Sequence, residues 1–250
     1  PREEVAFCRP GEEIKQIAVI TRVGKPVCFK VVSISEEHGA PVAILSRRLA
    51  QIECKNAFLN DLICGDIIRA KITHLENFGA FVDIGCGIVS LLTVDCISVS
   101  RISHPSDRFS VGEYIPVVIR SIEPETDRLF VSHRELLGTW AENAAEFAPM
   151  QTVSGIVRSI EDYGIFIELA PNLAGLAEYK SGVHVGEVAS VYIKSIIPAR
   201  MKVKLVLIDS SAAVCSPIKR KYYINADEVH HIDRWLYSPP GCSKVIETVF

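Results

Sequence analysis

A short alternating pattern with a glycine at its centre occurs twice in this chain and limits the folds open to it. The first copy spans residues 67–85 and the second spans residues 153–169, with Gly79 and Gly164 at equivalent places. Apolar and polar residues alternate on both sides of each glycine, which is typical of two short β-strands joined by a tight turn. A chain that repeats such a hairpin is expected to form small β-domains rather than one large core.

The alternation places aromatic residues on the outer face of both hairpins. Side chains along a strand point to opposite faces with a period of two, so the alternate apolar set should be buried. That set is Ala80, Val82, Ile84, Ile165, Ile167 and Leu169. Phe81 and Phe166 then point outwards, Phe166 together with Glu168, while Phe78 and Tyr163 lie at the bends. Exposed rings beside basic strand residues are what unpaired bases stack on.

A second signature marks three repeats. It consists of Val-Gly, eight residues and Ser-Ile, and it begins at Val23, Val111 and Val185. The glycine-centred hairpin precedes the second and third copies but not the first. We therefore expect the first repeat to be incomplete, with its opening strands upstream of Pro1, so that the chain is a fragment lacking its N-terminus.

The repeats and the stretches between them predict the organisation of the chain. The expected segments are the C-terminal half of a truncated first repeat (1–48), a helical connector (49–64), a complete domain (65–132), a helical connector (133–149), a further complete domain (150–209) and a tail with a possible small hairpin (210–250). Each complete unit holds five short strands joined by turns, which predicts an all-β protein of tandem five-stranded antiparallel barrels joined by short helices.

Two expectations concern the irregular stretches. Residues 132–147 read as one helix, with Ser132 as its cap and Trp140 packed between the units. In the tail, the residues on either side of the turn-like 225–228 would pair as a hairpin that 239–241 breaks.

Composition narrows the classes of function. A formal net charge of −3 argues against binding of polyanions by overall charge, so any nucleic-acid contact must rest on local patches. The eight cysteines show no spacing typical of zinc sites. The cluster His230, His231, Asp233 and Cys242 invites a metal interpretation, but we favour a structural tail. No metal and no cofactor are expected, and no apolar run reaches membrane-spanning length.

The quoted residues resemble a known family. The runs GDIIRAKITHLENFGAFVDIG and HPSDRFSVGEYIPVVIRSIEPETDRLFVSHREL are similar to the RNA-binding domain named after ribosomal protein S-one, above all in Gram-positive, clostridial members. The likeness covers 65–209 well and 1–48 in part. It implies oligonucleotide-binding (OB) barrels that hold single-stranded RNA or mRNA, and a cytoplasmic ribonucleoprotein partnered with the small ribosomal subunit in translation. It also implies that the first repeat can dock onto protein.

The resemblance implies an RNA-binding face built from two aromatic residues, a histidine, an acidic residue and a basic residue. In the second unit these positions hold Phe78, Phe81, Thr93, Glu123 and Arg128, and in the third they hold Tyr163, Phe166, Glu178, Ile197 and Lys202. Both histidines are thus replaced. With the cations on the outer strand faces, the candidate RNA-binding residues are Phe78, Phe81, Lys71, Arg128, Tyr163, Phe166, Arg158, Lys202 and Arg200.

Three other interpretations stay open. Phe81 and Phe166 could pack under a connector helix instead of meeting a base. The chain could be the RNA-binding part of a ribonuclease or of an enzyme like polynucleotide phosphorylase, although it contains no phosphate-binding loop, nucleophile elbow or HExxH motif. It could also be a scaffold that docks proteins. We expect it not to be an enzyme.

Overall fold

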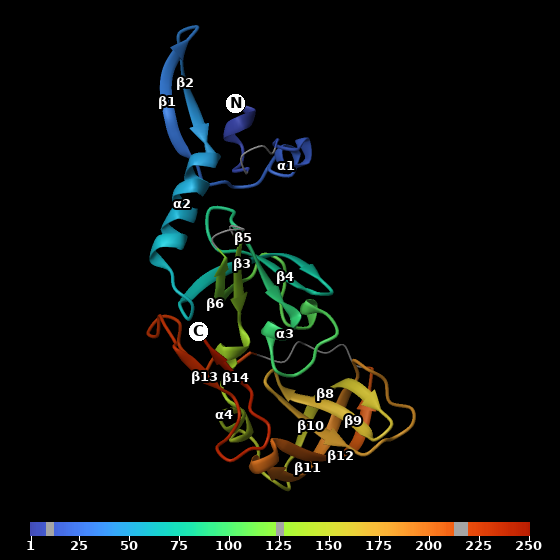
Figure 1. Ribbon diagram of the computed structural model, residues 1–250. Helices are drawn as coiled ribbons and strands as arrows, with labels where there is room; N and C mark the ends of the chain where they lie inside the picture. The colour runs from blue at the N-terminus through green and yellow to red at the C-terminus, as the bar shows by residue number, and fades with distance from the viewer. Residues whose placement is uncertain (9–12, 124–127, 213–219) are drawn as a thin grey trace. The chain divides into compact units, whose positions relative to one another are not determined.

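Figure 1 shows the computed structural model of the chain, which describes residues 1–8, 13–123, 128–212 and 220–250. The chain forms two compact units, one of residues 1–63 with 83–90 and the other of residues 64–82 with 91–250. Within the described ranges, no helix combines the length and the apolar character needed to cross a membrane.

The first unit is a two-stranded hairpin followed by a long helix. Its elements are η1 (Arg2–Glu4), α1 (Gln16–Ile20), β1 (Lys30–Glu37), β2 (Ala40–Ser46) and α2 (Arg47–Asp61). The Ser46 hydroxyl caps α2 by accepting a hydrogen bond from the Leu49 amide at 2.9 Å. The guanidinium of Arg48 pairs with Glu4 at 2.7 Å, which ties the start of the chain to the helix.

Strands that follow α2 form two closed five-stranded barrels of the same topology. The first consists of β3 (Ile67–Glu76), β4 (Gly79–Asp83), β5 (Val89–Thr93), β6 (Tyr114–Glu123) and β7 (Arg128–Ser132), and the second of β8 (Thr152–Glu161), β9 (Gly164–Ala170), β10 (Leu173–Ala177), β11 (Val188–Ile197) and β12 (Lys202–Ser211). The predicted all-β fold of five-stranded barrels is confirmed. One refinement follows from the odd strand number, because strands that alternate in direction cannot all be antiparallel in a ring of five. The pairs β5–β7 and β10–β12 are accordingly parallel.

The cores of the barrels agree with the alternation read from the sequence. All six apolar residues assigned to the inner face of the two hairpins are at most 6% exposed. A Cβ atom on Gly79 would lie 2.4 Å from the Leu92 carbonyl oxygen, and one on Gly164 would lie 2.4 Å from that of Ala177. Glycine is therefore required where each hairpin passes close to the neighbouring strand, directly beside the aromatic residues.

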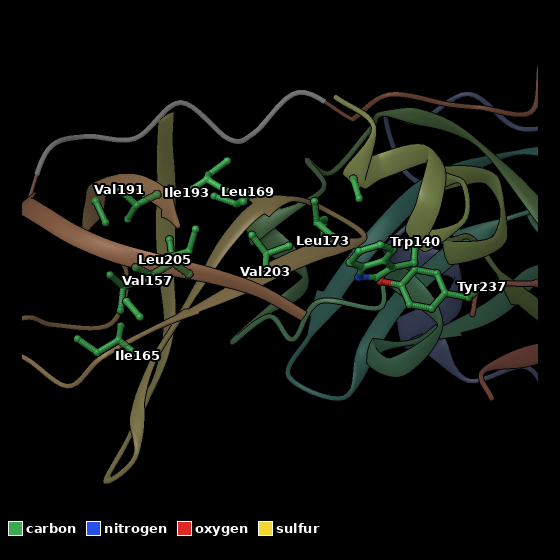
Figure 2. Packing of buried hydrophobic residues seen from close by; sticks show 14 of the residues in the cluster. Trp140, Val157, Ile165, Leu169, Leu173, Val191, Ile193, Val203, Leu205 and Tyr237 are labelled. Carbon is green, nitrogen blue, oxygen red and sulfur yellow. The ribbon is translucent and has the colours of Figure 1, made fainter. Parts of the chain in front are cut away.

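The prediction of a single helix over 132–147 is wrong. Two short elements, η3 (Arg134–Leu137) and α4 (Trp140–Ala144), are separated by Gly138, whose φ of +80° breaks the helix and whose missing side chain leaves room for the Tyr223 ring. Thr139, not Ser132, caps the longer piece through a capping box with Glu142. Figure 2 shows Trp140 beside Tyr237 at one end of the core cluster of the second barrel.

The tail packs against both barrels, and its hairpin differs from the expected one. Its strands are β13 (Arg234–Leu236) and β14 (Glu247–Val249), so residues 239–241 lie inside the connection of the hairpin instead of breaking it. Tyr222, Ile224, Ile232 and Phe250 of the tail pack on the first barrel, and Trp235 and Tyr237 pack on the second. The physical reason for the change is this burial, because the larger aromatic residues gain more from the barrel cores than from pairing with each other.

Candidate nucleic-acid interface

Two aromatic rings stand on the outer face of the first barrel, as the sequence predicts. Phe78 is 55% exposed, and its ring centroid lies 5.9 Å from that of Phe81 with the ring planes at 87°. The Thr73 hydroxyl donates a hydrogen bond of 3.0 Å to the Phe81 carbonyl, which fixes β3 against β4 beneath the rings. We call Phe78, Phe81 and the neighbouring His74 the first platform.

His74 is a residue that sequence reasoning missed. Its imidazole stacks on Phe81 with centroids 6.4 Å apart and planes at 27°, and its Nε2 lies 2.7 Å from a Glu76 carboxylate oxygen. Alternation along β3 assigns His74 to the inner face with Ile72, but the side chain is 64% exposed because the strand here extends towards the bend. The histidine position implied by the resemblance holds Thr93, and the structure places a different histidine, on β3, against Phe81. Its closeness to Phe78 in the sequence was the available signal.

The two candidate cations of the first barrel have neighbours other than its rings. The Nζ of Lys71 is placed over the ring of Tyr114, 5.2 Å from its centroid, where β3 pairs with β6. Arg128 is exposed at the start of β7, opposite Glu123 in the register with β6. The structure therefore brings together Phe78 and Phe81, while Lys71 lies over Tyr114 and Arg128 pairs in register with Glu123.

The second barrel repeats the same ring geometry. Tyr163 is 69% exposed, and its ring centroid lies 6.1 Å from that of Phe166 with the planes at 88°. We call this pair the second platform. The two rings line a cavity of about 440 Å³ together with Arg158, Arg200 and Lys202, so all five candidates of this barrel lie around one hollow.

Two outward residues of the second barrel have a structural role that alternation could not show. Glu168 leaves its own barrel core as expected, yet it is 0% exposed because Arg108, from the loop after α3 (Val94–Ile97), covers it. Its carboxylate is paired with the guanidiniums of both Arg108 and Arg158, and Arg158 also reaches Asp107 at 3.0 Å. Burial lowers the pKa of the Arg108 guanidinium, while the charge of Glu168 opposes that change. The guanidinium of Arg158 is therefore held by two carboxylates, and its side chain is only 7% exposed.

Further contacts fix the second barrel against the loop that follows the first. The Asn172 side chain accepts a hydrogen bond from the Val99 amide at 2.9 Å and donates to the Arg134 and Gly138 carbonyls. The buried hydroxyl of Tyr237 in the tail donates to the Asn172 carbonyl at 2.5 Å. These bonds hold loop, barrel and tail together around the second platform.

The histidines of the tail form a structural contact. His231 lies between Asp66, at 2.7 Å, and Asp233, at 3.2 Å, and the hydrogen bond to Asp66 raises the pKa of its imidazole. Among the residues that the structure describes, no group of three or more His, Cys, Asp or Glu side chains is arranged to hold a metal ion.

Comparison with known families agrees with this geometry. The S1 RNA binding domain family matches residues 62–134, which contain the first barrel and its platform. Residues 62–134 form an S1 RNA-binding domain. The resemblance drawn from the sequence is thereby confirmed, and the second barrel shares the strand order of this S1 domain.

Longer relatives extend the likeness beyond the S1 domain. The small ribosomal subunit protein bS1 of Staphylococcus haemolyticus is 34% identical over 175 residues, which are 68% of this chain and 42% of that protein. The bS1 protein of Staphylococcus epidermidis is 33% identical over 177 residues, 69% of this chain and 43% of that protein. The chain thus spans about two fifths of the length of these relatives. A crystal structure of a multidomain protein with nucleic acid binding domains from Streptococcus pneumoniae is 15% identical and covers 62% of this chain and 57% of that one, with a TM-score of 0.27.

Proposed function

We propose that this chain binds single-stranded RNA, including mRNA, through the two platforms and that it acts in translation at the small ribosomal subunit, in the cytoplasm. The observation that carries the proposal is the duplicated pair of outward rings, one exposed and one half-buried, held edge to face at almost the same spacing on both barrels. Bases offer a π-face whatever their sequence, so such rings support binding with little sequence preference. The S1 family match and the naming of the relatives as ribosomal proteins support the same assignment.

Two weak sites on one chain would act together. Each platform has room for a few nucleotides, and a strand that reaches both gains affinity through effective concentration without any new contact. The ion pairs of Glu168 with Arg108 and Arg158 fix the spacing between the second barrel and the loop after the first, which limits the entropy lost on binding.

The experiment is a titration of a short fluorescent single-stranded RNA with the wild type and with the Phe78→Ala, Phe81→Ala variant. Stacking contributes about 1–3 kcal/mol per base, so the variant should bind about 5- to 150-fold more weakly. Tyr179→Ala is the control, because Tyr179 is an aromatic residue 59% exposed that belongs to neither platform. Equal affinity of wild type and double variant would contradict the role of the first platform.

We further propose that the chain binds RNA without processing it. The relatives that match it are ribosomal proteins, and the described residues offer two stacking surfaces and a structural ion-pair network. RNA recovered at full length after incubation with the protein is the expected result. Shortened RNA in the presence of the wild type would instead favour the ribonuclease or phosphorylase interpretation.

A specific observation favours protein docking as an additional role of the first unit. Every residue of β1 is exposed, including Val31, Val32 and Ile34 at 50–73%. An exposed apolar strand of this kind is typical of a surface that meets a partner. Substitution of Ile34 by Lys should leave RNA affinity unchanged while weakening co-sedimentation with the small ribosomal subunit.

A further inference from the structure

Parts of the chain that do not belong to the second barrel help to line the cavity beside the second platform. The cavity of about 440 Å³ beside Tyr163 and Phe166 is also lined by Arg101, from the loop before β6, and by Lys244 and Ile246 of the tail. This volume is within the range of pockets that bind small organic groups, so the site is a hollow and not a flat surface. We call it the strap pocket, because the tail forms one of its walls.

The charge around the strap pocket is strongly one-sided. Four exposed cations line it, namely Arg101, Arg200, Lys202 and Lys244. No ion pair of these four occurs within the described part of the chain, and the carboxylate among the lining residues is that of Glu161. Arg158 adds no free charge, because Asp107 and Glu168 neutralise it. In a chain whose net charge is −3, such a local excess of positive charge indicates an anionic ligand.

The part of the tail that lines the strap pocket is anchored on the second barrel. Trp235 and Tyr237 are 5% exposed in the core of the second barrel, the Trp140 amide donates to the Tyr237 carbonyl at 3.0 Å, and the Tyr237 amide donates to the Ile246 carbonyl at 3.0 Å. Lys244 lies two residues before Ile246 on this anchored segment. The position of its backbone is therefore set by the barrel that carries the rings.

We propose that the strap pocket takes a single unstacked nucleotide of a single-stranded RNA, with its base against Tyr163 and Phe166 and its flanking phosphates on Arg101 and Lys244. This inference rests on the proposed function and assigns to the loop and the tail a direct part in it. Rings and free cations around one hollow match the two chemical parts of a nucleotide, because the base stacks and the phosphates need positive charge. The second platform then holds a strand at a defined nucleotide, whereas the first platform stacks bases at its surface.

The test compares the salt dependence of RNA binding in three forms of the full chain. The Arg101→Gln, Lys244→Gln variant removes two exposed cations of the pocket, and Lys25→Gln, Lys194→Gln removes two exposed cations outside it as a matched control. Each phosphate contact on a single strand contributes about 0.7 to the slope of log affinity against log salt, so the pocket variant should lose about 1.4 of slope. Its deficit in affinity relative to wild type should accordingly shrink about sevenfold between 50 and 200 mM salt. The control should keep the slope of the wild type.

A second measurement detects stacking of the base, through the fluorescence of a base analogue. In a Phe78→Ala, Phe81→Ala background, a short RNA with one 2-aminopurine base should still lose fluorescence on binding, and the further change Tyr163→Ala should abolish that loss. If wild type binds RNA but the pocket variant has the same affinity and slope, or if quenching is absent in the background variant, the strap pocket is not a nucleotide site while the proposed function stands. If wild type binds no single-stranded RNA at all, the proposed function itself fails.

Discussion

The two platforms have nearly the same ring geometry but different surroundings. The ring planes meet at 87° in the first and 88° in the second, with centroids 5.9 and 6.1 Å apart. At the first platform a stacked histidine, His74, completes the surface, whereas at the second the loop and the tail line a cavity together with the rings. The barrel topology therefore determines how the rings are presented, and segments outside the barrel determine what kind of site they form.

Equivalent carboxylates show how the two barrels diverge. Asp83 and Glu168 both stand two residues after the outward phenylalanine of their hairpins. Asp83 accepts hydrogen bonds from the Gly85 and Gly87 amides at 2.9 and 3.0 Å and shapes its own turn. Glu168, one methylene longer, instead reaches two guanidiniums and is buried. The same position thus stabilises a turn in one barrel and the contact with the preceding loop in the other.

The largest effect should be the loss of stability on substitution of Glu168, which holds the buried ion pairs of the second barrel. Glu168→Gln keeps the shape of the side chain but leaves Arg108 and Arg158 without their shared charge, and loss of one partner of a buried ion pair costs about 3–5 kcal/mol. The free energy of unfolding in urea measures it. Asp83→Asn, which keeps a carbonyl acceptor at its turn, is the comparison and should cost about 1 kcal/mol or less. Equal losses would mean that the buried network is no more important than the turn.

The next effect concerns RNA affinity at the two platforms. Tyr163→Ala with Phe166→Ala should weaken binding of a short single strand more than Phe78→Ala with Phe81→Ala, because the strap pocket adds phosphate contacts that depend on a seated base. We expect the substitutions at the second platform to cost an amount near the upper end of the roughly 1–3 kcal/mol that stacking contributes. Those at the first platform should cost an amount near the lower end. Fluorescence titrations at one salt concentration give both numbers, and the reverse order would assign the tighter site to the first platform.

The sequence predicted the barrels and the rings because both depend on local alternation. Phe81 and Phe166 leave their cores by the two-residue period of a strand, and the glycines beside them are required by close strand contacts. The surroundings of the second platform depend instead on residues far apart in the chain, as in the contact of Arg108 with Glu168 or the cavity that Lys244 and Tyr163 both line. Because the tail has no repeat signature, no local pattern could indicate where it packs. His74 was missed for a related reason, since alternation fails where a strand continues beyond its barrel.

A smaller effect for each pH unit should appear on lowering the pH, through the contact that anchors the tail to the first barrel. His133 is fully buried, its Nδ1 donates to the Ile97 carbonyl at 3.0 Å, and its Nε2 accepts from the Tyr222 hydroxyl of the tail at 3.1 Å. Burial, assisted by Arg220 and Arg108, lowers the pKa of its imidazole from 6.5 to about 3. The unfolded chain therefore takes up a proton first as the pH falls, and stability should decrease by about 1.4 kcal/mol per pH unit below 6.5, down to about pH 3.

Urea unfolding between pH 7 and pH 4 measures this dependence, with His133→Gln as the comparison. The variant keeps a donor and an acceptor but loses the buried ring, so its stability should be lower at pH 7. Because it cannot titrate, its stability should fall less steeply on acidification. Parallel curves for the two proteins would show that other groups cause the loss. His231 has the opposite sign, because its raised pKa stabilises the fold at low pH and that contribution is lost as the pH rises through the folded value.

The smallest effect should be that of His74→Ala on the first platform. The imidazole stacks on Phe81 at 6.4 Å, and an aromatic pair of this kind is worth about 0.5–1.5 kcal/mol beyond the area that it buries. The pair is present before RNA binds, so its loss acts by leaving the Phe81 ring less fixed, and we expect RNA affinity to fall only about two- to fivefold. The measurement is sharpest in the Tyr163→Ala, Phe166→Ala background, where the rings of the first platform dominate binding. An unchanged affinity there would mean that His74 supports the Phe81 ring without meeting a base, and a loss as large as that of Phe81→Ala would make the histidine an equal member of the platform.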